Sequence, residues 1–210
     1  MKFETTKPDE IEARSMEIIV AELGDRTLPE PNFSVLKRCI HTSADFDYYE
    51  NLTFSDGAAE KGIAALRNGA SIVTDTKMAA AGINKIRLKA LGGDVHCYIS
   101  DDDVVQDAKA GGCTRAVMSM RKAARMDGRI IFAIGNAPTA LMELDRLIRK
   151  ENIRPAMIIG VPVGFVNVVE SKDLIIATCE EFDIPYIVAR GRKGGSNIAA
   201  TICNAMIYYR

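Results

Sequence analysis

Short apolar runs alternate with amphipathic helical patterns over the last two thirds of the chain. The runs are rich in β-branched side chains, which favour strands, whereas the segments between them repeat apolar residues at helical spacing. We expect strands in residues 71–73, 95–99, 130–134, 156–159 and 186–188, and helices in residues 84–91, 102–110, 114–126, 139–150, 168–182 and 196–208. Parallel strands need long crossovers that are usually helical, so the pattern predicts an α/β protein with a mostly parallel five-stranded sheet and helices on both faces.

The first third of the chain has only helical patterns. Pro8, two acidic residues and Gly24 mark the two ends of a first helix. Apolar residues at positions 33, 35, 36 and 40 predict a second, and Ser55 caps a third over residues 56–67. We therefore expect one domain over residues 1–210, with an N-terminal helical segment at about 8–69 and an α/β core at about 70–210.

Composition narrows the class of protein. The formal net charge of -1 gives no global positive field, so we expect no binding to nucleic acid. The five cysteines contain no CxxC pair and lie mostly in apolar runs, which favours reduced thiols in a cytoplasmic protein over disulfides or a metal cluster. No apolar run approaches the ~20 residues of a membrane span, so no membrane partner is expected either.

Unusual residues follow each predicted strand. Ligands of open parallel sheets bind beyond the carboxyl ends of the strands, so these loops are candidate contacts. The candidate residues are Asp75, Thr76, Lys77, Arg115, Asn136, Arg192, Gly194, Gly195 and Ser196. Each also has a purely structural interpretation as a helix cap or turn residue. Their joint occurrence at one edge of the sheet favours a binding site.

The loop at residues 190–196 is the strongest candidate anion site. Arg192 and Lys193 bring charge, the two glycines could admit a ligand to backbone N–H groups, and Ser196 begins a helix. The loop matches neither GxGxxG nor GxxxxGK[ST], so a nucleotide is weakly indicated. The apolar residues 160–165 suit a wall against a flat ligand. Together these features predict a ligand with several carboxylates or phosphates.

His41 is the remaining candidate for proton transfer. The chain has two histidines, and His96 lies inside a predicted strand, where packing is the simpler explanation. We find no Ser-His-Asp arrangement, no metal-ligand cluster and no thiol with an obvious base. A histidine needs little tuning to exchange a proton near neutral pH. A helix-end histidine satisfied by a neighbour is the structural alternative.

Four segments closely resemble the precorrin-8X methylmutases of corrin-ring (vitamin B12) biosynthesis. They are Ile-His-Thr-Ser-Ala-Asp at 40–45, Gly-Asn-Ala-Pro-Thr-Ala at 135–140, Gly-Val-Pro-Val-Gly-Phe at 160–165 with Glu-Ser-Lys at 170–172, and Arg-Gly-Arg-Lys-Gly-Gly-Ser at 190–196. Arg14-Ser15 and Thr114-Arg115 also resemble family positions. The resemblance extends over nearly the whole chain, and the motifs in combination are highly specific.

The resemblance implies an isomerase that moves a methyl group from C11 to C12 of a tetrapyrrole with several carboxylates, by a 1,5-sigmatropic shift. It implies His41 as general acid, substrate contacts that include Arg14 and Ser15, a homodimer with the site near the subunit interface, and no separate cofactor or protein metal site, because any cobalt belongs to the substrate. Residues 40–48 look more like the cobalt-containing branch than the metal-free one. The alternatives are a corrinoid carrier that retains product without catalysis and, on the 190–196 loop alone, a phosphate-binding α/β enzyme.

Overall fold

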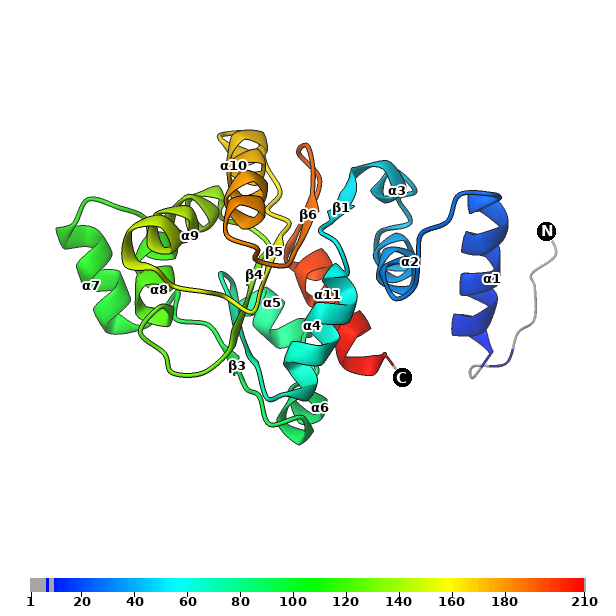
Figure 1. Ribbon diagram of the computed structural model, residues 1–210, viewed down its shortest axis with the longest axis horizontal. Helices are drawn as coiled ribbons and strands as arrows, with labels where there is room; N and C mark the ends of the chain where they lie inside the picture. Colours follow the sequence, from blue (N-terminus) through cyan, green and yellow to red (C-terminus); the bar gives the residue numbers. More distant parts are fainter. Residues whose placement is uncertain (1–6, 8–9, 210) are drawn as a thin grey trace.

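The computed structural model describes residues 7 and 10–209. The predicted start of the first helix at positions 8 and 9 lies outside these residues. Six strands form one sheet in the order β1-β6-β5-β4-β2-β3 (Figure 1). They are β1 (Leu52–Phe54), β2 (Ser71–Thr74), β3 (Val95–His96), β4 (Ile130–Ile134), β5 (Met157–Gly160) and β6 (Tyr186–Ala189).

The sheet has one strand more than the five predicted. The additional strand, β1, pairs antiparallel with β6, whereas all other neighbours are parallel. Its three residues are too few to show a period of two, so only the pairing with β6 defines it. β3 is shorter than predicted, with two residues instead of five. The continuously apolar β4 and β5 are central and fully buried, as expected for parallel strands covered on both faces.

Eleven helices surround the sheet in the described part of the chain. They are α1 (Ile11–Leu23), α2 (Asn32–Ser43), α3 (Tyr48–Asn51), α4 (Ala58–Arg67), α5 (Lys77–Gly82), α6 (Lys85–Ala90), α7 (Asp102–Ala110), α8 (Arg115–Ala123), α9 (Pro138–Glu151), α10 (Val168–Glu181) and α11 (Ser196–Tyr208). All predicted helices are present. The short helices α3 and α5 are additional, and α8 ends three residues before the predicted position.

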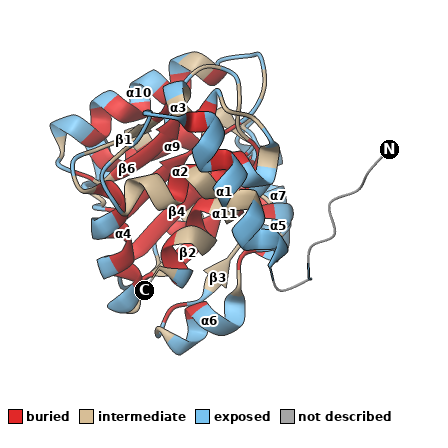
Figure 2. Cartoon of the chain, turned by 90° about the vertical axis from the view of Figure 1, so that its right-hand side faces the viewer, coloured by how far each residue is buried: buried red, intermediate tan, exposed pale blue. Residues whose placement is uncertain are grey.

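Two apolar cores lie on opposite faces of the sheet. Ile131 belongs to a core shared with α2, α4 and α11, and the next residue, Phe132, belongs to a core shared with α8, α9 and α10. This alternation follows from the period of two along a strand. The predicted helices on both faces are therefore confirmed. Figure 2 shows the buried strands behind α2 and α11, with α1 largely exposed on the outside.

The loops that follow the parallel strands meet at one edge of the sheet. The Asp75 carboxylate, just after β2, accepts N–H groups from the loop after β4. The N–H of Gly195, after β6, donates to the carbonyl of Val161, after β5, at 2.9 Å. Helix α11 begins at this edge and runs away from it beneath α2 (Figure 1).

Candidate functional site

A cleft of about 740 Å³ lies between α1, α2 and the C-terminal half of α11. Glu12 on α1, Arg38 and His41 on α2, and Thr201 and Tyr208 on α11 are among its lining residues. The volume falls in the range of about 300–1,000 Å³ that is typical of small-molecule sites. The lining is mainly polar and aromatic, so the cleft suits a ligand that combines a ring with polar substituents.

His41 enters this cleft from the last turn of α2. The preceding residues Cys39 and Ile40 are buried against the protein body, which turns the His41 side chain outward to an exposed position. Ala44 then ends the helix in a left-handed conformation, with φ of 53°, and its N–H donates to the Ile40 carbonyl. Helix α2 therefore ends two residues after His41.

A hydrogen bond fixes the end of α2 on α11. The hydroxyls of Thr42 and Thr201 are 2.9 Å apart. Both threonines line the cleft with His41, and a separate, smaller hollow of about 240 Å³ is lined by Ser43, Val163 and Asn197 among others. Thr201 follows Ser196 by five residues, which is about 8 Å along a helix axis. The Thr201 end of this contact therefore lies about 8 Å along α11 from the edge of the sheet, where Ser196 begins the helix.

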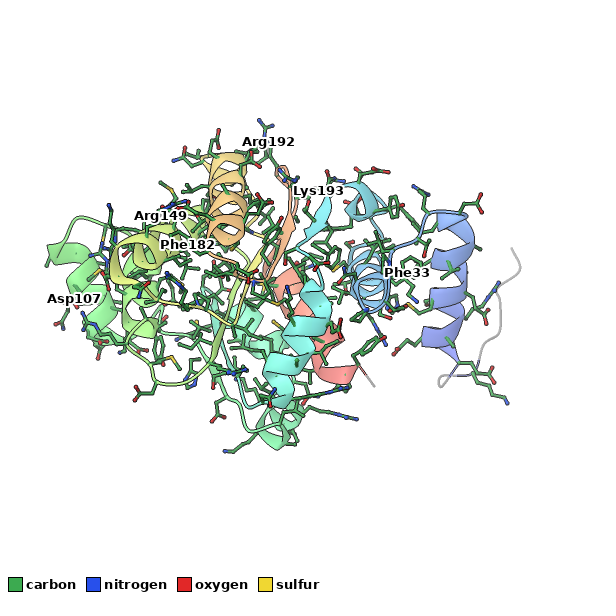
Figure 3. The ribbon with its side chains drawn as sticks, viewed as in Figure 1. Phe33, Asp107, Arg149, Phe182, Arg192 and Lys193 are labelled. Carbon is green, nitrogen blue, oxygen red and sulfur yellow. The ribbon has the colours of Figure 1, made fainter. Side chains whose placement is uncertain are left out.

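Lys193 ties the loop after β6 to the segment that follows His41. Its ammonium donates to Asp45 at 2.6 Å and to Asp47 at 2.5 Å. These hydrogen bonds raise the pKa of Lys193, and the bond from Lys193 lowers the pKa of Asp45. Two carboxylates thus neutralise a cation that the sequence suggested for anion binding. The Arg192 side chain takes a different direction (Figure 3). Its guanidinium carbon lies 5.5 Å from the centre of the Phe165 ring.

The glycines of the 190–196 loop serve packing between loops. A Cβ at Gly194 would lie 2.1 Å from the Val161 carbonyl oxygen, and the Gly195 N–H already donates to that oxygen. A Cβ at Gly135 would lie 2.7 Å from Cα of Ser196. At Gly194 this contact between loops requires a glycine, and the expected ligand contact of Gly194 and Gly195 stays a prediction. No L side chain fits where the loops touch.

Thr76 and Ser196 are partners at the start of α11. Their hydroxyls are 2.8 Å apart, and Thr76 also caps α5 by accepting the N–H of Ala79. Ser196 is 9% exposed. The two predicted site residues are brought together as expected, but mainly to join α5 to α11.

Asp75 supports the site from inside the protein. It is 1% exposed, and its two oxygens accept the N–H groups of Gly135, Asn136 and Ala137 at 2.6–2.9 Å. Burial raises the pKa of Asp75, while the three N–H donors oppose that shift. Its carboxylate does not face solvent, which corrects the expectation of direct ligand contact. Asp75 instead holds the backbone of Asn136, a residue that is exposed at this edge of the sheet.

Lys172 is a buried lysine that our sequence analysis did not include among the site residues. Its side chain on α10 is fully buried, and its ammonium donates to the carbonyls of Gly191 and Lys193, both at 2.8 Å. Burial lowers the pKa of Lys172 to about 8. The Glu-Ser-Lys motif at 170–172 was the available signal. Its partners are backbone groups, which no motif specifies.

The other predicted residues lie outside the His41 cleft of this chain. Arg14 donates to Glu17 at 3.2 Å, and the Ser15 hydroxyl donates to the Ile11 carbonyl, both within α1. Lys77 and Arg115 are exposed at the first positions of α5 and α8, on the edge where the strands end. His41 alone of the predicted residues is among those that line the cleft.

The described residues show neither a clustered metal site nor a membrane-spanning helix. They contain no group of three or more His, Cys, Asp or Glu side chains placed to hold a metal ion. None of their helices combines the length and the apolar character that crossing a membrane requires. The expectation that no separate cofactor is needed stays a prediction.

The fold and cleft define a doubly wound α/β protein with a histidine-bearing small-molecule site, and comparison with known proteins specifies its family. The family model of precorrin-8X methylmutase matches residues 10–209. A cobalt-precorrin-8 methylmutase of Leptospira interrogans is 45% identical over 94% of this chain and 91% of its own length, and one of Priestia megaterium is 43% identical over 96% and 88%. A precorrin-8X methylmutase structure from Thermus thermophilus superposes with a TM-score of 0.84 at 37% identity, covering 94% of this chain and 96% of that chain.

The chain belongs to the precorrin-8X methylmutase family. The predicted resemblance is confirmed, and with it an isomerase of cobalamin biosynthesis.

Proposed function

We propose that this enzyme moves a methyl group from C11 to C12 of a corrin-precursor tetrapyrrole, converting cobalt-precorrin-8 or precorrin-8X to cobyrinate or hydrogenobyrinate. The family assignment supports this reaction. The observation that supports placing the reaction in the cleft is the exposed residue His41 in the lining of that cleft. Both named relatives reported above carry cobalt in their substrate's name, which favours the cobalt-containing substrate here.

His41 acts as the general acid in this proposal. Its imidazolium donates a proton to the ring near C11, which withdraws electron density from the bond to the methyl group. The methyl group migrates with its bonding pair to C12, and a proton returns to the imidazole, so the product is an isomer of the substrate. A positioned acid of this kind contributes typically ~10²–10⁴-fold to the rate. No separate cofactor takes part, since any cobalt arrives with the substrate.

The substrate's carboxylates are bound by cations and amides at the rim. Lys77, Arg115, Arg192 and Asn136 are exposed at the edge of the sheet, and Arg14 is exposed on α1. Val163, in the loop after β5, lines the smaller hollow, and Phe165 in the same loop is exposed. This division into apolar wall and polar rim suits a flat ring that carries several acids.

The functional unit in this proposal is a homodimer. Phe165 and Val166 are 82% and 78% exposed, and Met78 is 70% exposed. Phe165 and Val166 are adjacent in the loop after β5, and exposed apolar patches often mark protein interfaces. Light scattering after size exclusion should give twice the chain mass, whereas a monomer at micromolar concentration would contradict the dimer.

Turnover distinguishes the enzyme from a corrinoid carrier. Purified protein should convert the cobalt-loaded substrate, and more slowly the metal-free one, with a time-dependent change in the absorption spectrum. A carrier would bind the ring and leave the spectrum constant. The phosphate-binding alternative loses its support, because Lys193 is paired and Gly194 faces a carbonyl.

A further inference from the structure

The turn that follows helix α2 is held by a series of side-chain contacts. The Ser43 hydroxyl donates to the carbonyl of Cys39 at 2.7 Å and accepts the N–H of Asp45 at 3.2 Å. The N–H of Asp47 donates to the Asp45 carboxylate at 3.0 Å. These hydrogen bonds connect both aspartates to the last turn of α2, which contains His41.

Lys193 holds this turn from a distant part of the chain. Its ammonium donates to Asp45 at 2.6 Å and to Asp47 at 2.5 Å, and its backbone carbonyl accepts the buried ammonium of Lys172 at 2.8 Å. An isolated exposed ion pair contributes little to stability, whereas a network of several charges can contribute more. The end of α2 is therefore clamped to the loop after β6, and that loop is itself held by α10.

The position of His41 explains why such a clamp matters. The last turn of a helix opens readily, because its final carbonyl groups have no partner within the helix. His41 lies two residues before the end of α2, and it is exposed. A catalytic group must be held to within about 0.5 Å of its productive position. A contact that suppresses opening of this turn therefore affects turnover without touching the substrate.

We propose that Lys193 is a positioning residue for the reaction and holds His41 in place through Asp45 and Asp47. The inference rests on the proposed function, in which His41 is the acid. Lys193 transfers no proton, and its charge is neutralised by two carboxylates of the protein itself. Its ammonium contributes to turnover through the end of α2 and not by contact with the substrate.

Kinetics in two backgrounds test this assignment. Lys193→Met should lower kcat about 10- to 100-fold, the loss expected when a catalytic group moves by about 1 Å. It should leave the dissociation constant of cobyrinate within about threefold. In the His41→Asn background, where no acid is left to position, Lys193→Met should change the residual single-turnover rate less than about twofold. Lys193→Arg keeps a cation that can reach both carboxylates, and it should recover part of the lost activity.

Lys122 provides a matched control, because it makes the same kind of contact elsewhere. From α8 its ammonium donates to Asp101 at 2.8 Å and to Asp103 at 2.7 Å, and all three residues lie outside the lining of the His41 cleft. Lys122→Met removes an equivalent clamp between a lysine and two aspartates. It should leave kcat within about twofold of the wild-type value.

Amide hydrogen exchange monitors the clamp without substrate. The N–H groups of Ala44, Asp45 and Asp47 all donate within the turn. Lys193→Met should make their exchange about tenfold faster, and Lys122→Met should leave it unchanged. Thermal melts verify that each variant is folded. If Lys193→Met does not fold, the combination of Asp45→Asn with Asp47→Asn removes the same contacts from the other side and carries the test.

Three results would overturn the inference. They are a wild-type kcat in folded Lys193→Met, an equal loss of kcat in Lys122→Met, and an undiminished loss when Lys193→Met is combined with His41→Asn. The exchange measurement needs no turnover, so a failure of the proposed reaction is distinguishable from a failure of the clamp. In the former case the wild-type protein would leave the substrate spectrum constant, while Lys193→Met would still speed exchange in the turn.

Discussion

Replacing Lys172 by methionine tests how the loop at residues 190–195 is held. Methionine has a similar length and no charge, so it fills the same space within α10. The carbonyls of Gly191 and Lys193 would lose their donor, which costs about 1–3 kcal/mol each. The burial of a charged amine would be relieved at the same time, and replacing a buried charge by an apolar group is often close to neutral. We therefore expect a small net change in the free energy of unfolding at pH 7.

The diagnostic quantity is the pH dependence of that free energy. Burial lowers the pKa of Lys172 from 10.5 to about 8. Between these two values the unfolded chain binds one proton more than the folded protein, so the stability of the wild type rises with pH. Each factor of ten in proton affinity corresponds to about 1.4 kcal/mol. The free energy of unfolding should therefore rise by about 3 kcal/mol over the whole titration, and by about 2 kcal/mol between pH 7 and pH 9.5.

Urea denaturation of both proteins over this pH range measures the difference. The wild type should gain about 2 kcal/mol relative to Lys172→Met. Lys172→Gln is the control, because glutamine keeps a hydrogen-bond donor and cannot titrate. Its free energy of unfolding should be as independent of pH as that of Lys172→Met. It should also retain more amide-exchange protection in residues 190–195 than Lys172→Met. The reasoning would be refuted if the difference in unfolding free energy between wild type and Lys172→Met stayed constant over this pH range to within about 0.5 kcal/mol.

Further substitutions test the other loop contacts. Asp75→Asn leaves one acceptor oxygen for three N–H donors. We expect the free energy of unfolding in urea to fall by about 3 kcal/mol and amide exchange at residues 135–137 to become faster. Wild-type exchange rates at these residues would show that the Asp75 carboxylate does not hold the loop. Gly194→Ala forces a methyl group onto the Val161 carbonyl, so we expect a loss of more than about 2 kcal/mol, and an unchanged melting temperature would show that the loop moves freely.

Much of the fold could be predicted because its local patterns are strong. The central strands are continuous apolar runs, each is followed by a helix, and the apolar periodicity of α9 is clear. β1 was missed because three residues gain their conformation from pairing with β6. α5 was missed because its alanines show little contrast between faces, although Ala79 and Ala80 are buried and Met78 is exposed.

The site was predictable only where side-chain chemistry is distinctive. His41 could be identified because few residues exchange protons near neutral pH. Asp75 and Lys172 act on backbone groups that come together only when the loops fold, so their supporting roles could not be predicted. Gly194 illustrates the same limit, since the sequence cannot tell whether a glycine admits a ligand or a neighbouring carbonyl.

Substitution of His41 by asparagine tests the central claim most directly. Asparagine keeps a polar side chain of similar size at the exposed position on α2, and it cannot donate a proton as an imidazolium does. The variant should bind cobyrinate with an affinity close to that of the wild type while its kcat for the cobalt-loaded substrate falls about 10²–10⁴-fold. Turnover at the wild-type rate by the folded, ligand-binding variant would contradict the assignment of His41 as the acid.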